Sequence, residues 1–291
     1  MPSEAPDTGA SEAPDTGTGA GAGRHERILR VLDRLLYDAP FRAAFISGGP
    51  RNPEFPVDGD LIDAFGRVDP HELTLVGRRI RSKVVGGTET GTGAGAGAGT
   101  RTGPGLKDAF PRTLEAVREL HGVTANELAE AFIASPSFQD FRDVPFSPRG
   151  RGTTLPECFH HFMAAPPPFD PGGALEPLVH FEAATAVARA VAAGAGATFA
   201  VTLPESAFHG SVFCAFREYD EAPAAWALRP TMYLADAGRC VVGPARRPVF
   251  EALRTILAGR GELIAAEVRE PLEQRLRAWG FRRQVGDRPP P

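Results

Sequence analysis

Apolar side chains recur at helical spacing in the first part of the chain. A stripe over residues 28–36 has the period of an amphipathic helix, which we expect to end near Pro40. A second stripe follows Asp69 and Pro70, which supply an N-cap and a first-turn proline. The pattern therefore predicts an N-terminal helical segment, residues 24–85.

Further helical patterns with short connections predict a compact bundle over residues 106–194. The first carries an apolar stripe from Leu106 to Val117, and the last follows Asp170 and continues until Gly194. Two others begin at capping boxes, in which an N-cap threonine is followed three residues later by a glutamate: Thr124 with Glu127, and Thr154 with Glu157.

Beyond Thr198 the pattern changes to short runs of β-branched and aromatic residues. These runs predict a small antiparallel sheet with strands Thr198–Leu203, Val212–Arg217, Thr231–Leu234 and Arg239–Val242. A helix that opens at Arg247 follows, and Pro271 is expected to split the next helical pattern in two. With a strand-like end, Phe281 to Val285, residues 195–291 resemble a winged-helix domain. We expect an α+β, mainly helical fold.

Two stretches lack the apolar side chains that a packed core needs. Residues 1–23 contain the heptapeptide Ser-Glu-Ala-Pro-Asp-Thr-Gly twice and then run into glycine and alanine. Residues 86–105 alternate glycine with alanine and threonine. Neither stretch can offset its ordering entropy by burial, so we expect a disordered tail and a flexible linker.

Charge and cysteine content narrow the classes of function. The formal net charge is −4, but four acids lie in the predicted tail (Glu4, Asp7, Glu12 and Asp15), so the rest of the chain is nearly neutral. Nucleic-acid binding normally needs a basic excess, so nucleic acid is a less favoured partner. The three widely spaced cysteines, Cys158, Cys214 and Cys240, indicate reduced thiols. With neither an export signal nor a membrane span, we expect a cytoplasmic protein.

The candidate chemical groups do not add up to an active site. Cys158, His160 and His161 are the densest cluster of metal-ligand residue types, but zinc needs at least three protein ligands, and no further ligand stands at a suitable spacing. Ser211 lacks the turn motif of a nucleophilic serine. We therefore expect no catalytic residue, no metal and no cofactor, and we keep a metalloenzyme as the third alternative.

A basic cluster surrounds the last predicted helix and favours an alternative reading. It consists of Arg275, Arg277, Arg282 and Arg283. In a DNA-binding winged helix these side chains would belong to the recognition helix and the wing. Three acids interleave with them, namely Glu267, Glu270 and Glu273, and would face phosphates unfavourably. A winged-helix transcription regulator is the second hypothesis.

Five motifs occur in a characteristic order: residues 78–81, 109–111, 131–136, 155–163 and 175–183. In this order they resemble the MbnC-like family of partner subunits of multinuclear iron peptide-modifying oxygenases, a family also described as a DNA-binding domain. The resemblance covers about two thirds of the chain. The chain departs from the family pattern at the insertion 86–105, and at residues 181–183, where Phe-Glu-Ala replaces Leu-Glu-Trp.

The resemblance implies a non-catalytic adaptor that binds the leader of a ribosomal precursor peptide and docks it on the oxygenase subunit. Candidate partner-docking residues are Phe110, Phe159, His160, Phe162 and Glu182. For the peptide we expect a site on the sheet and the last helix, with candidates Phe213, Phe216, Tyr233, Leu272, Leu276 and Trp279. Strand addition suits such a partner, because main-chain hydrogen bonds supply affinity for an extended peptide.

Overall fold

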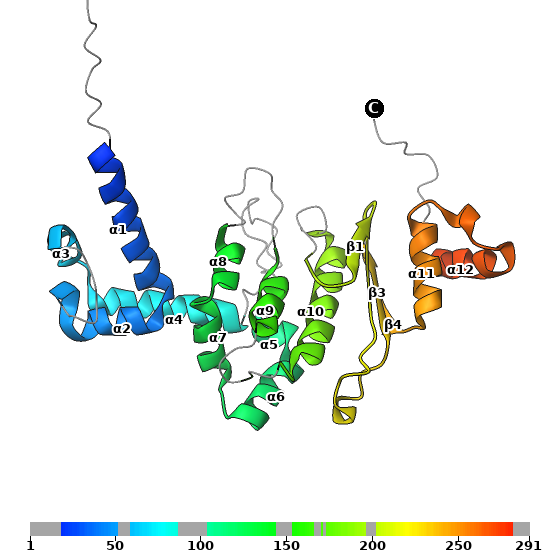
Figure 1. The fold of residues 1–291 in the computed structure, drawn as a ribbon, viewed down its shortest axis with the longest axis horizontal. Helices are drawn as coiled ribbons and strands as arrows, with labels where there is room; N and C mark the ends of the chain where they lie inside the picture. Colours follow the sequence, from blue (N-terminus) through cyan, green and yellow to red (C-terminus); the bar gives the residue numbers. More distant parts are fainter. Residues whose placement is uncertain are drawn as a thin grey trace, which may run out of the picture. The chain divides into compact units, whose positions relative to one another are not determined.

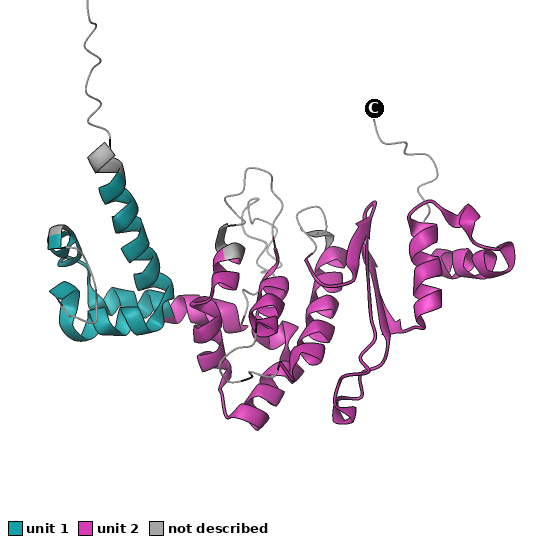
Figure 2. Cartoon of the chain, viewed as in Figure 1, with its two compact units in different colours: residues 1–77 teal, residues 78–291 magenta. Residues whose placement is uncertain are grey.

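The computed structural model describes residues 19–51, 59–86, 104–143, 153–165, 170, 173–195 and 202–281. These residues are mainly helical and contain one four-stranded antiparallel sheet, as predicted. The contacts divide the chain into two compact units, Met1–Gly77 and Arg78–Pro291 (Figures 1 and 2). In the described ranges, no helix combines the length and the apolar character needed to cross a lipid bilayer.

The first unit is helical. It is built from α1 (Gly19–Tyr37), α2 (Ala39–Gly48), α3 (Ile62–Phe65) and the beginning of α4 (Pro70–Gly86). Its buried core consists of Leu35, Phe41, Phe45, Leu61, Phe65 and Leu73. Asp38 separates α1 from α2, because its carboxylate accepts a hydrogen bond from the backbone N–H of Phe41 at 2.9 Å. The first helix therefore ends just before Pro40, as expected.

The low-complexity stretches require one correction. Helix α1 begins at Gly19, inside the range 1–23 that was predicted to be a tail. Extending an existing helix costs much less than starting one, so the apolar stripe after residue 28 can carry the helix back into glycine and alanine. Residues 1–18 lie outside the described residues, as does most of the predicted linker, residues 87–103.

Among the described residues, the helical part of the second unit contains the end of α4 and six further helices. The six are α5 (Leu106–Ala109), α6 (Pro111–His121), α7 (Ala125–Ile133), α8 (Pro136–Asp143), α9 (Leu155–Ala164) and α10 (Glu176–Ala190). Both predicted capping boxes are present, at the starts of α7 and α9. The core between these helices is rich in phenylalanine, and the Phe132 ring lies 5.2 Å from Phe159 and 5.3 Å from Phe138 between centroids.

The helical part differs from the prediction in two places. The stripe from Leu106 to Val117 is broken into α5 and α6, because Pro111 cannot donate a backbone hydrogen bond and starts a new helix. Helix α8 was not predicted. Its start at Pro136 follows the end of α7 directly, so no separate apolar stripe marked it.

The sheet is a meander in the order β1-β2-β3-β4. Its strands are β1 (Ser206–His209), β2 (Val212–Arg217), β3 (Thr231–Asp236) and β4 (Arg239–Pro244). The last three match the predicted strands, with β3 and β4 each two residues longer. The first prediction is wrong in its described part, because Thr202 and Leu203 are not in a strand; residues 198–201 lie outside the described residues. Strand β1 instead pairs with β2 across a two-residue turn that has Gly210 at φ 61°.

Helices cover both faces of the sheet (Figure 1). Tyr233, on one face, lies against α10, where its ring centroid is 6.3 Å from that of Phe181. The other face packs on α11 (Arg247–Leu257) and α12 (Ala266–Ala278). This second core includes Cys214, Phe216, Met232, Leu234, Phe250, Leu253, Leu272 and Leu276. The central strands are therefore buried on both sides.

The C-terminal helices correct one expectation. Pro271 was predicted to split the last helical pattern, yet α12 continues through it. Proline here removes one backbone donor, and burial of Leu272 and Leu276 in the sheet core holds the helix together. The predicted final strand falls mostly outside the described residues, which end at Phe281, a residue that is not in a strand.

Helix α10 joins the two parts of the second unit. It packs against α9 on the helical side and against β3 and β4 on the sheet side. Residues on both sides of the predicted boundary at 194 and 195 therefore belong to one compact unit, 78–291.

Candidate functional site

The candidate partner-docking residues lie mainly in the core of the helical part. Phe110 and Phe159 are fully buried with ring centroids 4.6 Å apart, and His160 is 2 % exposed. Phe162 is half-buried at the edge of the same aromatic cluster, 6.0 Å from Phe159. Among the five candidates, only Phe162 therefore reaches the surface appreciably.

Glu182 caps another helix. Its carboxylate accepts hydrogen bonds from the backbone N–H groups of Arg112, at 3.0 Å, and Thr113, at 2.9 Å. These groups lie in the first turn of α6, where a helix has free donors and a partial positive charge. Burial raises the pKa of Glu182 against the effect of these bonds. The side chain joins α10 to α6, which is a structural role.

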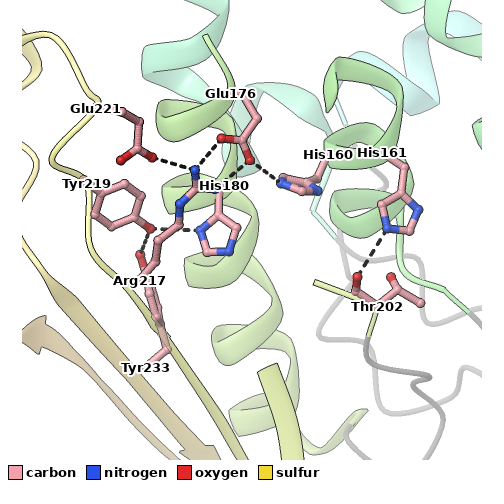
Figure 3. Close-up of polar contacts among 9 residues, drawn as sticks. All are labelled: His160, His161, Glu176, His180, Thr202, Arg217, Tyr219, Glu221 and Tyr233. Atoms are coloured by element: carbon pink, nitrogen blue, oxygen red, sulfur yellow. Dashed lines mark hydrogen bonds and ion pairs between the residues drawn. The ribbon is translucent and has the colours of Figure 1, made fainter. Parts of the chain in front are cut away.

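Glu176 is the centre of a polar network between α9, α10 and β2 (Figure 3). The Arg217 guanidinium donates to both carboxylate oxygens at 2.6 Å, and His160 Nε2 lies 3.2 Å from Oε1. Arg217 also pairs with Glu221 at 2.6 Å. Burial alone would raise the pKa of Glu176, but the contacts with His160 and Arg217 lower it to about 2. This carboxylate is therefore ionised and charge-compensated at neutral pH.

His180 belongs to a neighbouring buried chain of hydrogen bonds (Figure 3). Its Nδ1 lies 2.9 Å from the Tyr219 hydroxyl, which lies 2.8 Å from the Tyr233 hydroxyl. Burial lowers the pKa of His180 to about 3, so the ring is neutral. All three side chains are at most 3 % exposed, and the arrangement connects the helices to the sheet.

The residues considered as metal ligands have separate partners. Cys158 Sγ contacts the Thr153 hydroxyl at 3.2 Å, His160 contacts Glu176, and His161 Nε2 lies 3.4 Å from the Thr202 carbonyl oxygen. In the part of the chain that the structure describes, no group of three or more His, Cys, Asp or Glu side chains is arranged to hold a metal ion.

The candidate peptide-binding residues are divided between the two faces of the sheet and are mostly buried. Phe213, Phe216 and Tyr233 are each 0 % exposed. Leu272 and Leu276 belong to the core under α12. These five side chains fill the interior and are not open to a peptide, because helices cover both faces of the sheet. The prediction had assumed that one face was uncovered. Only Trp279 is half-buried at the surface.

Trp279 lines a surface groove of about 490 Å³ between β4, α11 and α12. Apolar side chains contribute to its walls, namely Met232, Val241, Val249 and Trp279. Three arginines from different elements also line it, namely Arg229, Arg246 and Arg275. From the sequence, Trp279 and Arg275 were singled out, whereas Arg229 and Arg246 were missed; the double arginine just before the α11 proline was the available signal for Arg246.

Strand β4 is an edge of the sheet. In the described residues it pairs with β3 alone, across the two-residue turn Ala237–Gly238. The backbone N–H of Ala245 donates to the Pro230 carbonyl at 3.0 Å. This bond shows which of the alternating residue pairs between β3 and β4 are joined by hydrogen bonds. Because inward and outward groups alternate in antiparallel pairs, Cys240 and Val242 turn their N–H and C=O groups away from β3. A groove with apolar and basic walls thus lies beside an edge strand.

Comparisons with protein-family models, with curated proteins and with solved structures found no match to this chain.

Proposed function

We propose that this chain is a non-catalytic adaptor, which binds a ribosomal precursor peptide and docks it on an iron-dependent oxygenase in natural-product biosynthesis. The observation that supports peptide binding is the edge of β4 next to the groove that contains Trp279; in the described part of the chain, no second strand pairs with this edge. An unpaired edge is a template for another strand. The choice of oxygenase and precursor as partners comes from the resemblance to the MbnC-like family.

In this proposal the peptide adds to the sheet as a fifth strand. The outward N–H and C=O groups of Cys240 and Val242 would pair with the peptide backbone. Successive side chains of a strand point to opposite faces, so every second peptide side chain would enter the groove beside Trp279. The main chain then supplies affinity, and the groove selects the sequence.

Oxygenase docking is assigned to the helical part, residues 106–194. Phe110, Phe159 and Glu182 act there by fixing how the helices pack, and Phe162 adds apolar surface. Co-expression with the iron-binding protein encoded nearest to its gene, followed by gel filtration, tests this assignment. Separate elution of the two proteins would contradict it.

A winged-helix DNA-binding regulator is the second candidate. The helices α11 and α12 and the β3–β4 hairpin could form its helical unit and wing, and Arg275 and Arg277 are exposed on α12. However, Glu267 and Glu270 line the same surface hollow as Arg277. Carboxylates at this place repel phosphates, so the peptide is the favoured partner. Salt-resistant, sequence-specific binding to duplex DNA would favour the regulator.

The strand-addition test removes one outward backbone donor. Peptides are first selected on the full chain from a displayed library of random twelve-residue sequences, and one selected peptide is labelled. We expect Val242→Pro to weaken its binding about tenfold, since one main-chain hydrogen bond is worth roughly 1 kcal/mol and proline also restricts the strand.

The matched control is Val242→Ala, which also shortens the side chain but keeps the N–H group. We expect it to change the dissociation constant less than threefold. Circular dichroism and thermal melting verify that both variants are folded; proline is tolerated at the outward positions of an edge strand. Equal binding by both variants would place the peptide away from β4.

A further inference from the structure

Three arginines beside β4 lack acidic partners in the described residues. Arg229, Arg246 and Arg275 are exposed and line the groove, and no carboxylate of the described chain pairs with them. Nearby arginines do have such partners. Arg247 lies 3.2 Å from Glu205 and 3.3 Å from Glu218. The groove therefore combines unpaired positive charges with an apolar wall.

The positions of these arginines make their charge costly in the free protein. Arg246 is the N-cap residue of α11, makes no side-chain capping bond, and is followed by a first turn without an acid. A cation at this end of a helix opposes the helix dipole. Arg229 and Arg275 bring two more positive charges to the same groove. A bound carboxylate would offset both effects, and guanidinium groups match carboxylates in shape as well as charge.

The apolar wall indicates which other group a ligand needs besides its carboxylates. Trp279 packs partly against the core, and its remaining surface lines the groove with Val241 and Val249. The Arg275 guanidinium carbon lies 5.8 Å from the centre of the Trp279 ring, so a basic and an aromatic group stand side by side. A ligand that satisfies both has an apolar side chain for the ring and an acidic side chain for the arginines.

We infer that the groove selects an extended peptide segment in which an apolar residue is flanked, two positions away, by aspartate or glutamate. In a strand, residues i and i+2 point to the same face and lie roughly 7 Å apart, so one apolar and one acidic side chain can enter the groove together. This inference rests on the proposed function. It adds the chemical class of the peptide, which strand addition alone does not specify.

Duplex DNA is the rival anion for the same arginines. A phosphate backbone carries no apolar side chain that could pack on Trp279, Val241 and Val249. The neighbouring hollow on α12, which contains Arg277, is also lined by the carboxylates of Glu267 and Glu270. These features favour an acidic peptide over a nucleic acid.

The test reads the composition of peptides selected on the full chain from the random twelve-residue library. We expect aspartate and glutamate to be enriched two positions from an aromatic or aliphatic residue. A labelled peptide of this kind should bind at least tenfold more tightly than the same peptide with its acids changed to Gln or Asn. Its affinity should fall as salt is raised.

Two arginine-to-glutamine variants, one in the groove and one outside it, test whether the groove causes the preference for acidic peptides. Arg246→Gln should weaken the acidic peptide fivefold or more and leave the amide version within twofold. Arg118→Gln removes an exposed arginine of α6 that is outside the groove lining, and should leave both peptides within twofold of wild type.

The outcomes separate this inference from the proposed function. Selected peptides that lack an acidic excess, but lose binding in Val242→Pro, would overturn the inference and leave strand addition in place. If no selected peptide binds the wild-type chain more tightly than the Val242→Pro variant, both the inference and strand addition would be overturned. Tighter binding of a twenty-base-pair duplex than of the acidic peptide, abolished in Arg246→Gln, would show that the groove is a phosphate-binding surface.

Discussion

Single buried groups in this protein take their chemistry from what surrounds them. Glu182 belongs to α10 but satisfies two backbone donors of α6, one of them in a fully buried residue. An isosteric amide can still accept at least one of these bonds, whereas an aliphatic side chain accepts none. Leaving a buried N–H unsatisfied costs about 1–3 kcal/mol.

We therefore predict that Glu182→Leu lowers the free energy of unfolding by about 2 kcal/mol or more, and that Glu182→Gln lowers it by less. Urea denaturation at neutral pH measures both. Because burial raises the pKa of Glu182, loss of its charge should be tolerated. Equal losses in the two variants would mean that the cap contributes little.

His180 leads to a prediction about pH. Burial lowers its pKa from 6.5 to about 3, so below about pH 6.5 the unfolded chain binds a proton that the folded chain does not. The contribution of the neutral ring to stability is thus complete above the unfolded pKa and is lost as the pH falls towards 3. One such proton corresponds to a slope of up to about 1.4 kcal/mol per pH unit.

The measurement compares unfolding free energies of wild type and His180→Gln at pH 7, 6 and 5. Glutamine can keep a hydrogen bond to Tyr219 but does not titrate. We expect the variant to be less stable at pH 7 and to lose less stability than wild type on going to pH 5. Parallel pH profiles would show that His180 is not the group responsible.

At the scale of elements, Glu176 and Arg217 connect the start of α10 to the end of β2. Their side chains are 24 % and 19 % exposed, so the ion pair is only partly screened by water. Removing one member of such a pair leaves the other charge poorly compensated, a larger penalty than for exposed pairs. Arg247 forms a comparable but more exposed pair with Glu205, at 41 % and 50 %.

Arg217→Gln should therefore lower the unfolding free energy by about 2 kcal/mol, and the matched variant Arg247→Gln by less than about 1 kcal/mol. Thermal melting at neutral pH orders the two variants. A larger loss of stability in Arg247→Gln than in Arg217→Gln would contradict the conclusion that the Glu176–Arg217 pair is the more stabilising of the two.

The elements that could be predicted from the sequence are those with local signals. The boxes at Thr124 and Thr154 each place a cap and its partner three residues apart, and both helices start there. Strands β2, β3 and β4 each contain β-branched or aromatic residues in short apolar runs bounded by polar residues, glycine or proline. In contrast, β1 is only four residues long and depends on pairing with β2, so its own sequence gives little indication.

The candidate site was predictable only in part, because its parts meet through tertiary packing. Trp279 stood out as an aromatic residue near the end of the last helix. That β4 is an edge, and that Arg229 and Arg275 line one groove, depends on strand order and on where α12 packs. Burial of Phe216 and Tyr233 on opposite faces follows from the coverage of both sides of the sheet, which alternation alone does not reveal.

At the scale of the whole molecule, α10 determines how the second unit can be divided. Val179, Ala183 and Val187 are fully buried, and the helix contacts both α9 and the sheet. A sequence boundary near residue 194 separates α10 from β3 and β4, against which it packs. Cutting there would expose apolar surface on both fragments, at roughly 25 cal/mol per Å².

We predict that residues 78–291 unfold in one cooperative transition, whereas a fragment of residues 78–195 has no sharp transition and binds a hydrophobic dye. The reason is that α10 in the shorter fragment lacks the sheet that buries one of its sides, including the contact between Phe181 and Tyr233. Calorimetry of both fragments provides the measurement. Adding residues 196–291 to the shorter fragment is the control, because reassembly should reduce dye binding if the loss is due to missing partners. A cooperative transition in the shorter fragment alone would mean that the helical part has its own sufficient core and that α10 does not require the sheet.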